Sequence, residues 1–348
     1  MAISLHEKYA KEIQTKFTRE SLITGRLSNV YSFSGVKTVN ITTPITVPMV
    51  DYTRTGANRY GTPQEMQDTV QELTLTQDKS FSMTIDKGNN LDQSGVKEAG
   101  RMLSLQIAEQ AVPTMDKYCF AKLAQNAGKI VEGDGNLTKS NICARITAGT
   151  THLDDAEVPD ADRTLFVPSS TYAMLRLSDE FIKCNPLAEK SLAKGQVGTY
   201  DGMAVIKVPA GRWPKNVNFI IAHKSAACAP VKLNDTKLHQ DPPGISGALL
   251  EGRQYYDLFV FGAKSDGVYA DVVSGVRCEK PAYISSDRSF SCTTSGATVA
   301  ITLDGSDPRY NKNMVVTNVP SDVKAGTIIR AYAFADGFFP SEVAEFTV

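Results

Sequence analysis

Two stretches of alternating polar and apolar residues flank a long polar segment, and this pattern constrains the fold more than any other feature of the chain. The alternation runs from Val36 to Val47 and returns from Leu73 to Ile85, whereas residues 51–71 offer almost no apolar side chains to bury. A period of two is typical of β-strands. We therefore predict the two arms of a long hairpin over residues 36–86, with a polar tip.

The predicted hairpin needs support from outside its own subunit. A two-stranded arm with a thin apolar face is marginal alone in water and exposes unpaired strand edges. A flexible surface loop is the simpler alternative, but alternation in both arms favours an ordered hairpin that lies on a neighbouring molecule. The candidate contact residues in its tip are Tyr52, Arg54, Arg59 and Tyr60.

Helical periodicity appears on both sides of the hairpin. Before it, apolar side chains recur at four-residue steps and predict an amphipathic helix from Ser4 to about Glu20, with a stripe that docks on a partner surface. The stripe consists of Leu5, Tyr9, Ile13 and Phe17. After the hairpin, a helix is predicted from Ser94, a candidate N-cap, to about Asn126. At 1.5 Å per residue it is about 45–50 Å long, and Pro113 is expected to kink it.

Strands and helices mix in the second half of the chain. Strands are predicted at residues 163–167, 203–208, 218–222 and 249–270, and Ser169 or Ser170 is expected to cap a helix toward Lys183. Residues 232–247 contain Asp-Pro-Pro-Gly and are expected to form an irregular loop at an edge or apex. Together these segments predict an α+β domain.

The composition shifts to Ser, Thr, Ala and Val from about Val276. Short alternating runs follow one another to residue 348, separated by turns at Asp304–Pro308 and Asp336–Gly337. Some seventy residues of this kind predict a compact all-β sandwich. We expect it to be a separate module.

Charge and composition exclude several classes of protein. The chain has 37 Lys and Arg against 38 Asp and Glu, so it lacks the basic excess of a dedicated nucleic-acid binder. Its apolar runs are far shorter than the roughly 20 residues that span a bilayer, and its first residues lack the apolar core of a secretory signal. The six cysteines are dispersed, which is typical of buried thiols; Cys278 and Cys292 alone are close enough in sequence to suggest a pair.

Catalytic and metal-binding patterns are missing from the sequence. The four histidines are scattered, with none three to five residues from another His or Cys. Asp304 and Asp307 lack the spacing of a calcium loop and fit a turn better, and Ser169 and Ser170 lack a nucleophile elbow. Residues 195–202 are glycine-rich but lack the spacing of a phosphate-binding loop. We expect no enzyme activity, cofactor or metal.

The order of these elements resembles the major capsid proteins of tailed bacteriophages (Caudoviricetes), which have the Hong Kong 97 fold. The segments that carry the resemblance are Glu72–Asp86, Leu165–Tyr172, Phe219–Ala226 and Gln254–Phe261. The C-terminal part resembles bacterial immunoglobulin-like modules of the chitobiase C-terminal type, through Ile301–Pro308 and Ile329–Ala335.

The resemblance implies a division of the chain. Residues 1–275 would form the shell domain and residues 276–348 an immunoglobulin-like domain on the outer surface. The shell domain would consist of an N-terminal arm (1–30), an extended loop (31–92), a spine helix with the peripheral domain (93–160) and a mainly axial domain (161–275).

The resemblance also implies a function and partners. The protein would assemble into pentamers and hexamers of an icosahedral head that encloses double-stranded DNA without reading its sequence, in virions assembled in the host cytoplasm. The arm and hairpin begin almost at once, so scaffolding is expected from a separate protein, with a portal as a further partner. Two alternatives stay open: an encapsulin-like cellular compartment, and a glycan-binding surface adhesin that uses residues 276–348.

Overall fold

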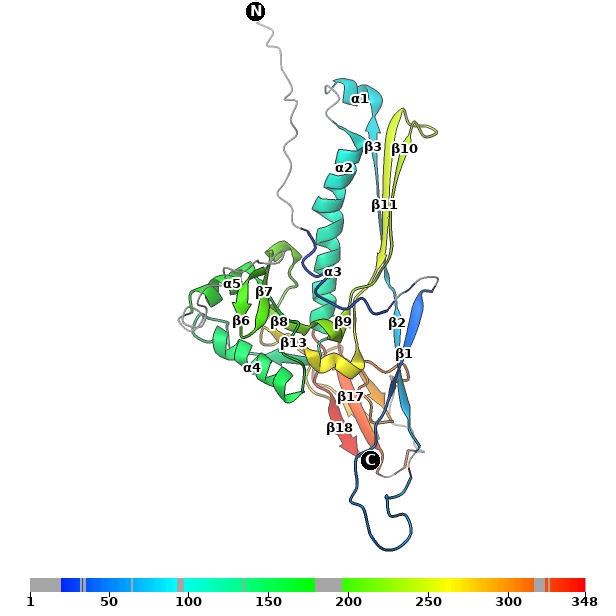
Figure 1. Cartoon of the computed structure of the whole chain (residues 1–348), viewed down its shortest axis with the longest axis vertical. Coiled ribbons are helices and arrows are strands. Elements are labelled where there is room, and N and C mark those ends of the chain that lie inside the picture. The colour runs from blue at the N-terminus through cyan, green and yellow to red at the C-terminus, as the bar shows by residue number, and fades with distance from the viewer. Residues whose placement is uncertain are drawn as a thin grey trace, which may run out of the picture.

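The computed structural model describes residues 20–31, 33, 36–63, 65–92, 97–133, 135–178, 196–315, 323–324 and 326–347. The predicted docking stripe of Leu5, Tyr9, Ile13 and Phe17 lies outside these residues, as does Ser94. The molecule is elongated: a long helix and a narrow sheet form one end, a rounded domain projects from the side, and a small β module lies near the other end (Figure 1). The predicted mixed α+β class is confirmed.

The long helix is built from three consecutive segments, α2 (Ala99–Gln106), the π-helical turn η1 (Ile107–Ala111) and α3 (Val112–Gln125). The predicted helix is therefore present, but Glu98 is its N-cap. Pro113 lies in the first turn of α3, directly after the π-helical turn. A proline cannot donate a backbone hydrogen bond, so an irregular turn at this point is the expected accommodation.

A narrow antiparallel sheet lies beside this helix (Figure 1), in the order β10 (Val231–Gln240), β11 (Gly247–Tyr256), β3 (Gln77–Asp86). The short helix α1 (Lys87–Asp92) follows β3 at the far end. Neither α2 nor η1 contains a buried residue. This part of the molecule is thus a thin, two-layered arm.

Two predictions about these strands are wrong. Residues 232–247 do not form an irregular loop, because strand β10 occupies most of them. The second predicted arm of the hairpin is split: β2 (Asp68–Thr74) pairs with β1 (Thr38–Pro44), whereas β3 pairs with β11. Residues 231–256 therefore lie beside the long helix. They are not part of the rounded domain, although we predicted them within the mainly axial domain of residues 161–275.

The rounded domain contains a six-stranded mixed sheet. Its order is β4 (Lys129–Glu132), β13 (Val268–Val272), β8 (Val217–His223), β5 (Arg163–Pro168), β7 (Met203–Val208) and β6 (Gln196–Tyr200). The turn η2 (Ala210–Arg212) lies along the chain between β7 and β8, which both belong to this sheet. Short segments connect the sheet to the rest: η3 (Lys224–Ala226), β9 (Ala227–Cys228), β12 (Phe259–Val260) and η4 (Gly262–Gly267).

Both faces of this sheet are covered by helices. Phe166 of the fully buried strand β5 packs with Phe120 of α3, at 5.3 Å between ring centroids. Its neighbours Leu165 and Val167 point to the opposite face and belong to the cluster with α4 (Ile142–Asp155) and α5 (Ser169–Arg176). Alternation along a strand explains this division of one apolar run between two clusters.

The C-terminal residues form two small sheets, β14 (Ala282–Ile284) with β15 (Ser289–Ser291), and β16 (Thr298–Thr302), β17 (Ile328–Phe334) and β18 (Ala344–Thr347). Tyr283, Phe290 and Phe346 join the sheets through ring contacts of 5.2–5.9 Å. However, Phe339 belongs to the main core around α3. The C-terminal module is therefore not separate from the larger domain. Cys278 and Cys292 are both free thiols.

Candidate assembly surface

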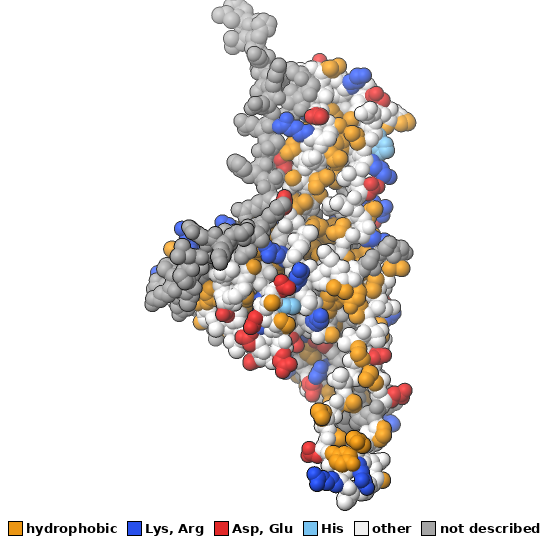
Figure 2. All heavy atoms as spheres, in the orientation of Figure 1, with side chains coloured by type: hydrophobic (Ala, Val, Ile, Leu, Met, Phe, Trp, Pro, Cys, Tyr) orange, Lys and Arg blue, Asp and Glu red, His pale blue; other side chains and the backbone are white. Residues whose placement is uncertain are grey.

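The hairpin of β1 and β2 ends in a tip with little internal packing. The backbone N–H of Ile45 donates to the carbonyl of Gln67 at 2.7 Å, and beyond this bond the chain leaves the ladder. The large apolar side chains exposed along the tip are Val47, Met49, Val50, Tyr52, Tyr60 and Met66. Figure 2 shows apolar side chains beside Lys and Arg side chains at this end of the molecule. Exposed apolar side chains gathered in this way are typical of interaction surfaces.

The structure brings two of the predicted tip contacts together. The rings of Tyr52 and Tyr60 meet edge to face at 4.9 Å between centroids, and Tyr60 remains 86% exposed. The N–H of Thr53 donates to the carbonyl of Arg59 at 3.1 Å. Arg54 and Arg59 are exposed on the same turn. The tip thus presents an aromatic pair with two positive charges, and its role in assembly stays a prediction.

The base of the hairpin is fixed to the core. Leu73 and Leu75 are buried in a cluster with Phe33, Cys228 and Phe261. The side-chain amide of Gln71 donates to the carbonyl of Val260 at 2.8 Å and accepts from the N–H of Gly262 at 2.9 Å. Because the base is anchored and the tip is exposed, the hairpin is held out from the body of its subunit.

A buried carboxylate sets the joint between the hairpin and the narrow sheet. Asp257, only 1% exposed, accepts hydrogen bonds from the N–H and the hydroxyl of Thr76 at 2.8 and 2.7 Å. It also accepts from the Tyr118 hydroxyl at 2.7 Å and from the N–H of Leu258 at 2.8 Å. Thr76 and Leu75 form the connection between β2 and β3, so Asp257 fixes where the chain passes from one sheet to the other.

Removing the hydroxyl of Tyr118 should weaken this joint. Burial, and secondarily its bond to Asp257, raises the pKa of Tyr118, so the hydroxyl stays a donor. A hydrogen bond to a charged group contributes about 1.5–3 kcal/mol, and we expect Tyr118→Phe to lower the free energy of unfolding by that amount in urea titrations. Tyr60→Phe, at an exposed tyrosine, is the control and should change it by less than about 0.5 kcal/mol. Equal effects of the two variants would contradict this role of Asp257.

A second buried carboxylate anchors the N-terminal segment. Asp116 of α3 is 0% exposed and accepts from the Ser21 hydroxyl at 2.6 Å and the N–H of Leu22 at 3.1 Å. It also pairs with Arg212 at 2.9 Å, and Arg212 donates to the carbonyl of Glu20 at 3.0 Å. Asp116 and Arg212 therefore fix residues 20–22 against α3.

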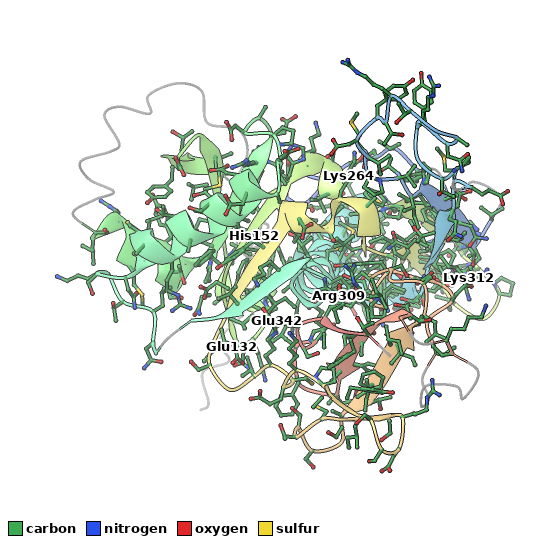
Figure 3. All side chains as sticks on the ribbon, turned by 90° about the horizontal axis from the view of Figure 1, so that it is seen from below. Glu132, His152, Lys264, Arg309, Lys312 and Glu342 are labelled. Carbon is green, nitrogen blue, oxygen red and sulfur yellow. The ribbon has the colours of Figure 1, made fainter. Side chains whose placement is uncertain are left out.

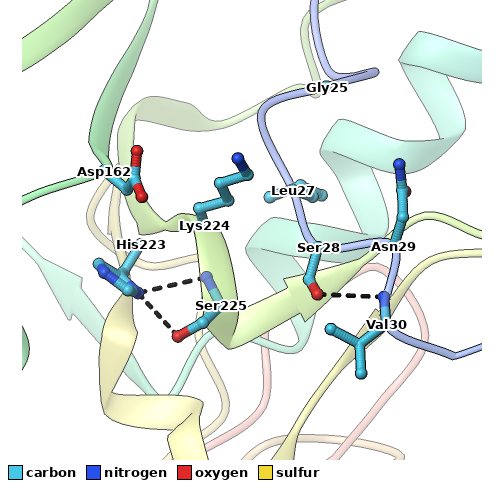
Figure 4. Close-up of a pocket in the computed structure, with 9 residues that line it drawn as sticks. All are labelled: Gly25, Leu27, Ser28, Asn29, Val30, Asp162, His223, Lys224 and Ser225. Atoms are coloured by element: carbon cyan, nitrogen blue, oxygen red, sulfur yellow. Dashed lines mark hydrogen bonds between the residues drawn. The ribbon is translucent and has the colours of Figure 1, made fainter.

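A cavity of about 580 Å³ lies beside this N-terminal segment, lined partly by Ser28, Asp162, His223 and Ser225 (Figure 4). The Nδ1 atom of His223 accepts from the N–H of Ser225 at 3.2 Å, and burial lowers the pKa of the ring. This histidine caps the short helix η3. Within the described part of the chain, no three His, Cys, Asp or Glu side chains gather to hold a metal, and no helix is long and apolar enough to cross a membrane.

Comparison with known proteins identifies the fold. No protein-family model and no curated protein matches the chain. A solved structure from Mycobacterium phage Che8 matches at 17% identity and a TM-score of 0.60, over 77% of this chain and 96% of that one. The capsid of Cyanophage P-SCSP1u matches at 13% and 0.61, over 77% and 93%. The mature capsid of bacteriophage PhiM1 matches at 13% and 0.59, over 79% and 93%. The chain has a phage capsid fold.

The phage capsid fold accounts for most of the chain and leaves a remainder. The three matched chains are covered almost completely, whereas nearly a quarter of this chain lies outside the match. The residues that hold the exposed hairpin in place, Asp257 and Gln71, could not be predicted from the sequence, and neither could Asp116, which anchors the N-terminal segment. No local motif marks them, because their partners lie far away in the sequence.

Proposed function

We propose that this protein is the major capsid protein of a tailed phage and that many copies assemble into the icosahedral head. The observation that carries the proposal is the hairpin of β1 and β2, with an anchored base and a tip of exposed apolar side chains, on a phage capsid fold. A second copy of the chain is the partner that such a tip requires, because symmetric shells reuse one contact many times. The protein then acts through geometry and not through catalysis.

The finer assignments belong to the same proposal. The fold is of the Hong Kong 97 type, with the long helix as spine, the narrow sheet in the peripheral domain and the six-stranded sheet in the axial domain. Pentamers and hexamers enclose double-stranded DNA, with help from a separate scaffolding protein and a portal. Assembly takes place in the host cytoplasm. Residues 276–348 form an immunoglobulin-like sandwich on the outer surface.

Electron microscopy of the overexpressed protein, with and without a scaffolding protein, tests the proposal. Closed shells are the expected result, and a stable monomer or dimer under every condition would contradict it. An encapsulin-like compartment would give shells that copurify with a protein cargo and without a genome. Shells from infected cells that contain double-stranded DNA separate the two functions.

The tip supplies a sharper test. Met49 is 100% exposed and Tyr60 is 86% exposed. Burial of each side chain against a neighbour contributes about 1.5–3 kcal/mol, so we expect the pair of substitutions Met49→Asp and Tyr60→Asp to lower shell yield more than about tenfold. Light scattering and electron microscopy measure the yield. Met49→Leu with Tyr60→Phe is the matched control and should assemble normally. Normal assembly of the aspartate variant would exclude the tip as a contact.

A further inference from the structure

One loop of the C-terminal module lies between the long helix and the hairpin. We name residues 307–313 the strut; they follow β16, and Figure 3 labels Arg309 and Lys312 within them. The strut contacts the backbone just beyond α3 at one end and strand β2 at the other. No other segment of the module described by the structure donates a backbone hydrogen bond to the hairpin.

The first end of the strut binds the chain where it leaves the long helix. The Arg309 guanidinium donates to the carbonyls of Ala127 and Gly128 at 3.1 and 3.0 Å, and the Tyr310 hydroxyl donates to the carbonyl of Asn126 at 2.8 Å. Asn126 is the C-cap of α3, and the last carbonyls of a helix lack partners within it and carry partial negative charge. The Tyr310 hydroxyl supplies a partner for the C-cap carbonyl, and the Arg309 cation lies just beyond the same negative helix end. Asp307 orients Arg309 through bonds of 2.7 and 3.1 Å.

The core is shaped to accept this end. Tyr310 packs against the main apolar cluster, and its Cβ lies 2.7 Å from the position that a Cβ on Gly262 would occupy. Real Cβ contacts are not this short, so glycine is required at residue 262. The strut therefore packs closely against Gly262 and the main apolar cluster.

The second end of the strut holds the hairpin. The backbone N–H of Lys312 donates to the carbonyl of Val70 at 2.9 Å, which adds a bond to strand β2 outside its pairing with β1. The Lys312 ammonium lies 2.9 Å from the Glu72 carboxylate, and its hydrogen bond lowers the pKa of Glu72. Gln71, which lies between Val70 and Glu72 in the strand, is bound to the core. Strand β2 is thus fixed both by the core and by the module.

We propose that the strut positions the hairpin, so that the C-terminal module takes part in assembly and is more than a surface attachment. The consequence for assembly rests on the proposed function of the hairpin. The positioning itself is a property of the single subunit and can be measured before any shell forms.

Swapping the charges of Lys312 and Glu72 tests the proposal. In unassembled subunits, hydrogen–deuterium exchange should report faster exchange of residues 68–74 in Lys312→Glu, where two carboxylates face each other, by about fivefold. Glu72→Lys should have the same effect. The double variant Lys312→Glu with Glu72→Lys restores the opposite charges and should return exchange to that of the natural protein. Lys280→Glu, at an exposed lysine elsewhere on the module, is the control and should change nothing.

The same variants are then examined for shells. The single variants should give fewer or irregular particles, and the double variant should recover them. If hydrogen–deuterium exchange of residues 68–74 is unchanged in both single variants, the proposal is overturned. It is also overturned if these residues exchange as fast in the double variant as in the single variants. If the natural protein forms no shells at all, the proposed function fails, whereas the exchange results still decide whether the strut positions the hairpin.

Discussion

Replacement of Asp116 by alanine should destabilise the protein by about 3–5 kcal/mol, because breaking one side of a buried ion pair leaves charged and polar groups without their partner. Asp116 is fully buried, forms an ion pair with Arg212, and accepts hydrogen bonds from the Ser21 hydroxyl and the N–H of Leu22. A typical domain has only 5–15 kcal/mol of stability in total. The midpoint of urea unfolding should therefore fall sharply.

A double variant separates charge from shape at the same position. Asp116→Leu with Arg212→Met removes both charges and keeps an apolar filling, and such replacements are often neutral or stabilising. We expect it to unfold at a higher urea concentration than Asp116→Ala. If the double variant is the less stable of the two, the hydrogen bonds to Ser21 and Leu22 outweigh the ion pair.

A chain that ends after residue 275 should not accumulate as a soluble subunit. The truncation removes Phe339 and Tyr310 from the main core, and the loss of one large aromatic side chain from a core costs about 3–5 kcal/mol. It also removes Arg277, which donates to the carbonyl of Ile130 at 2.7 Å. Soluble expression, followed by size-exclusion chromatography, measures the outcome.

Full-length variants show which contact matters. Tyr310→Ala should cost about 3–5 kcal/mol in urea unfolding, whereas Tyr310→Phe keeps the ring, loses the bond to Asn126 and should cost about 1 kcal/mol. A truncated chain that stays soluble and unfolds at the same midpoint as the full chain would show that the module is independent. That result would also return the adhesin hypothesis to consideration.

The first arm of the hairpin could be predicted from the sequence because its signal is local: the alternation is visible in the residues of β1. The second arm was predicted at Leu73–Ile85, whereas β2 (Asp68–Thr74) lies mostly within the segment predicted as the polar tip. The partner of β3 could not be predicted, since β3 pairs with β11 across a separation of more than 160 residues. Alternation identifies a strand but does not choose between two possible neighbours.

Strand β10 was missed for a different reason. It lies at the edge of the narrow sheet, and nearly all of its side chains are exposed. A strand without a buried face has no need of apolar residues at every second position, so its sequence resembles a loop. Only Asp307 and Pro308 of the strut fall within a predicted turn. The contacts of the strut could not be predicted, because the partners of Arg309 and Tyr310 are backbone carbonyls that no side-chain pattern reveals.

The joint at Thr76 has a consequence for the curvature of a shell. Strand β2 extends seven residues from this joint, about 23 Å at 3.3 Å per residue, so a 10° rotation would carry its far end about 4 Å. A lever of this length magnifies small angular errors, and the bonds to Asp257 and Lys312 restrain it at two points. On the proposed function, we expect copies in pentamers and hexamers to share one angle at Thr76 and to differ in residues 46–66. The angle of the hairpin would then be set within each subunit before that subunit contacts a neighbour.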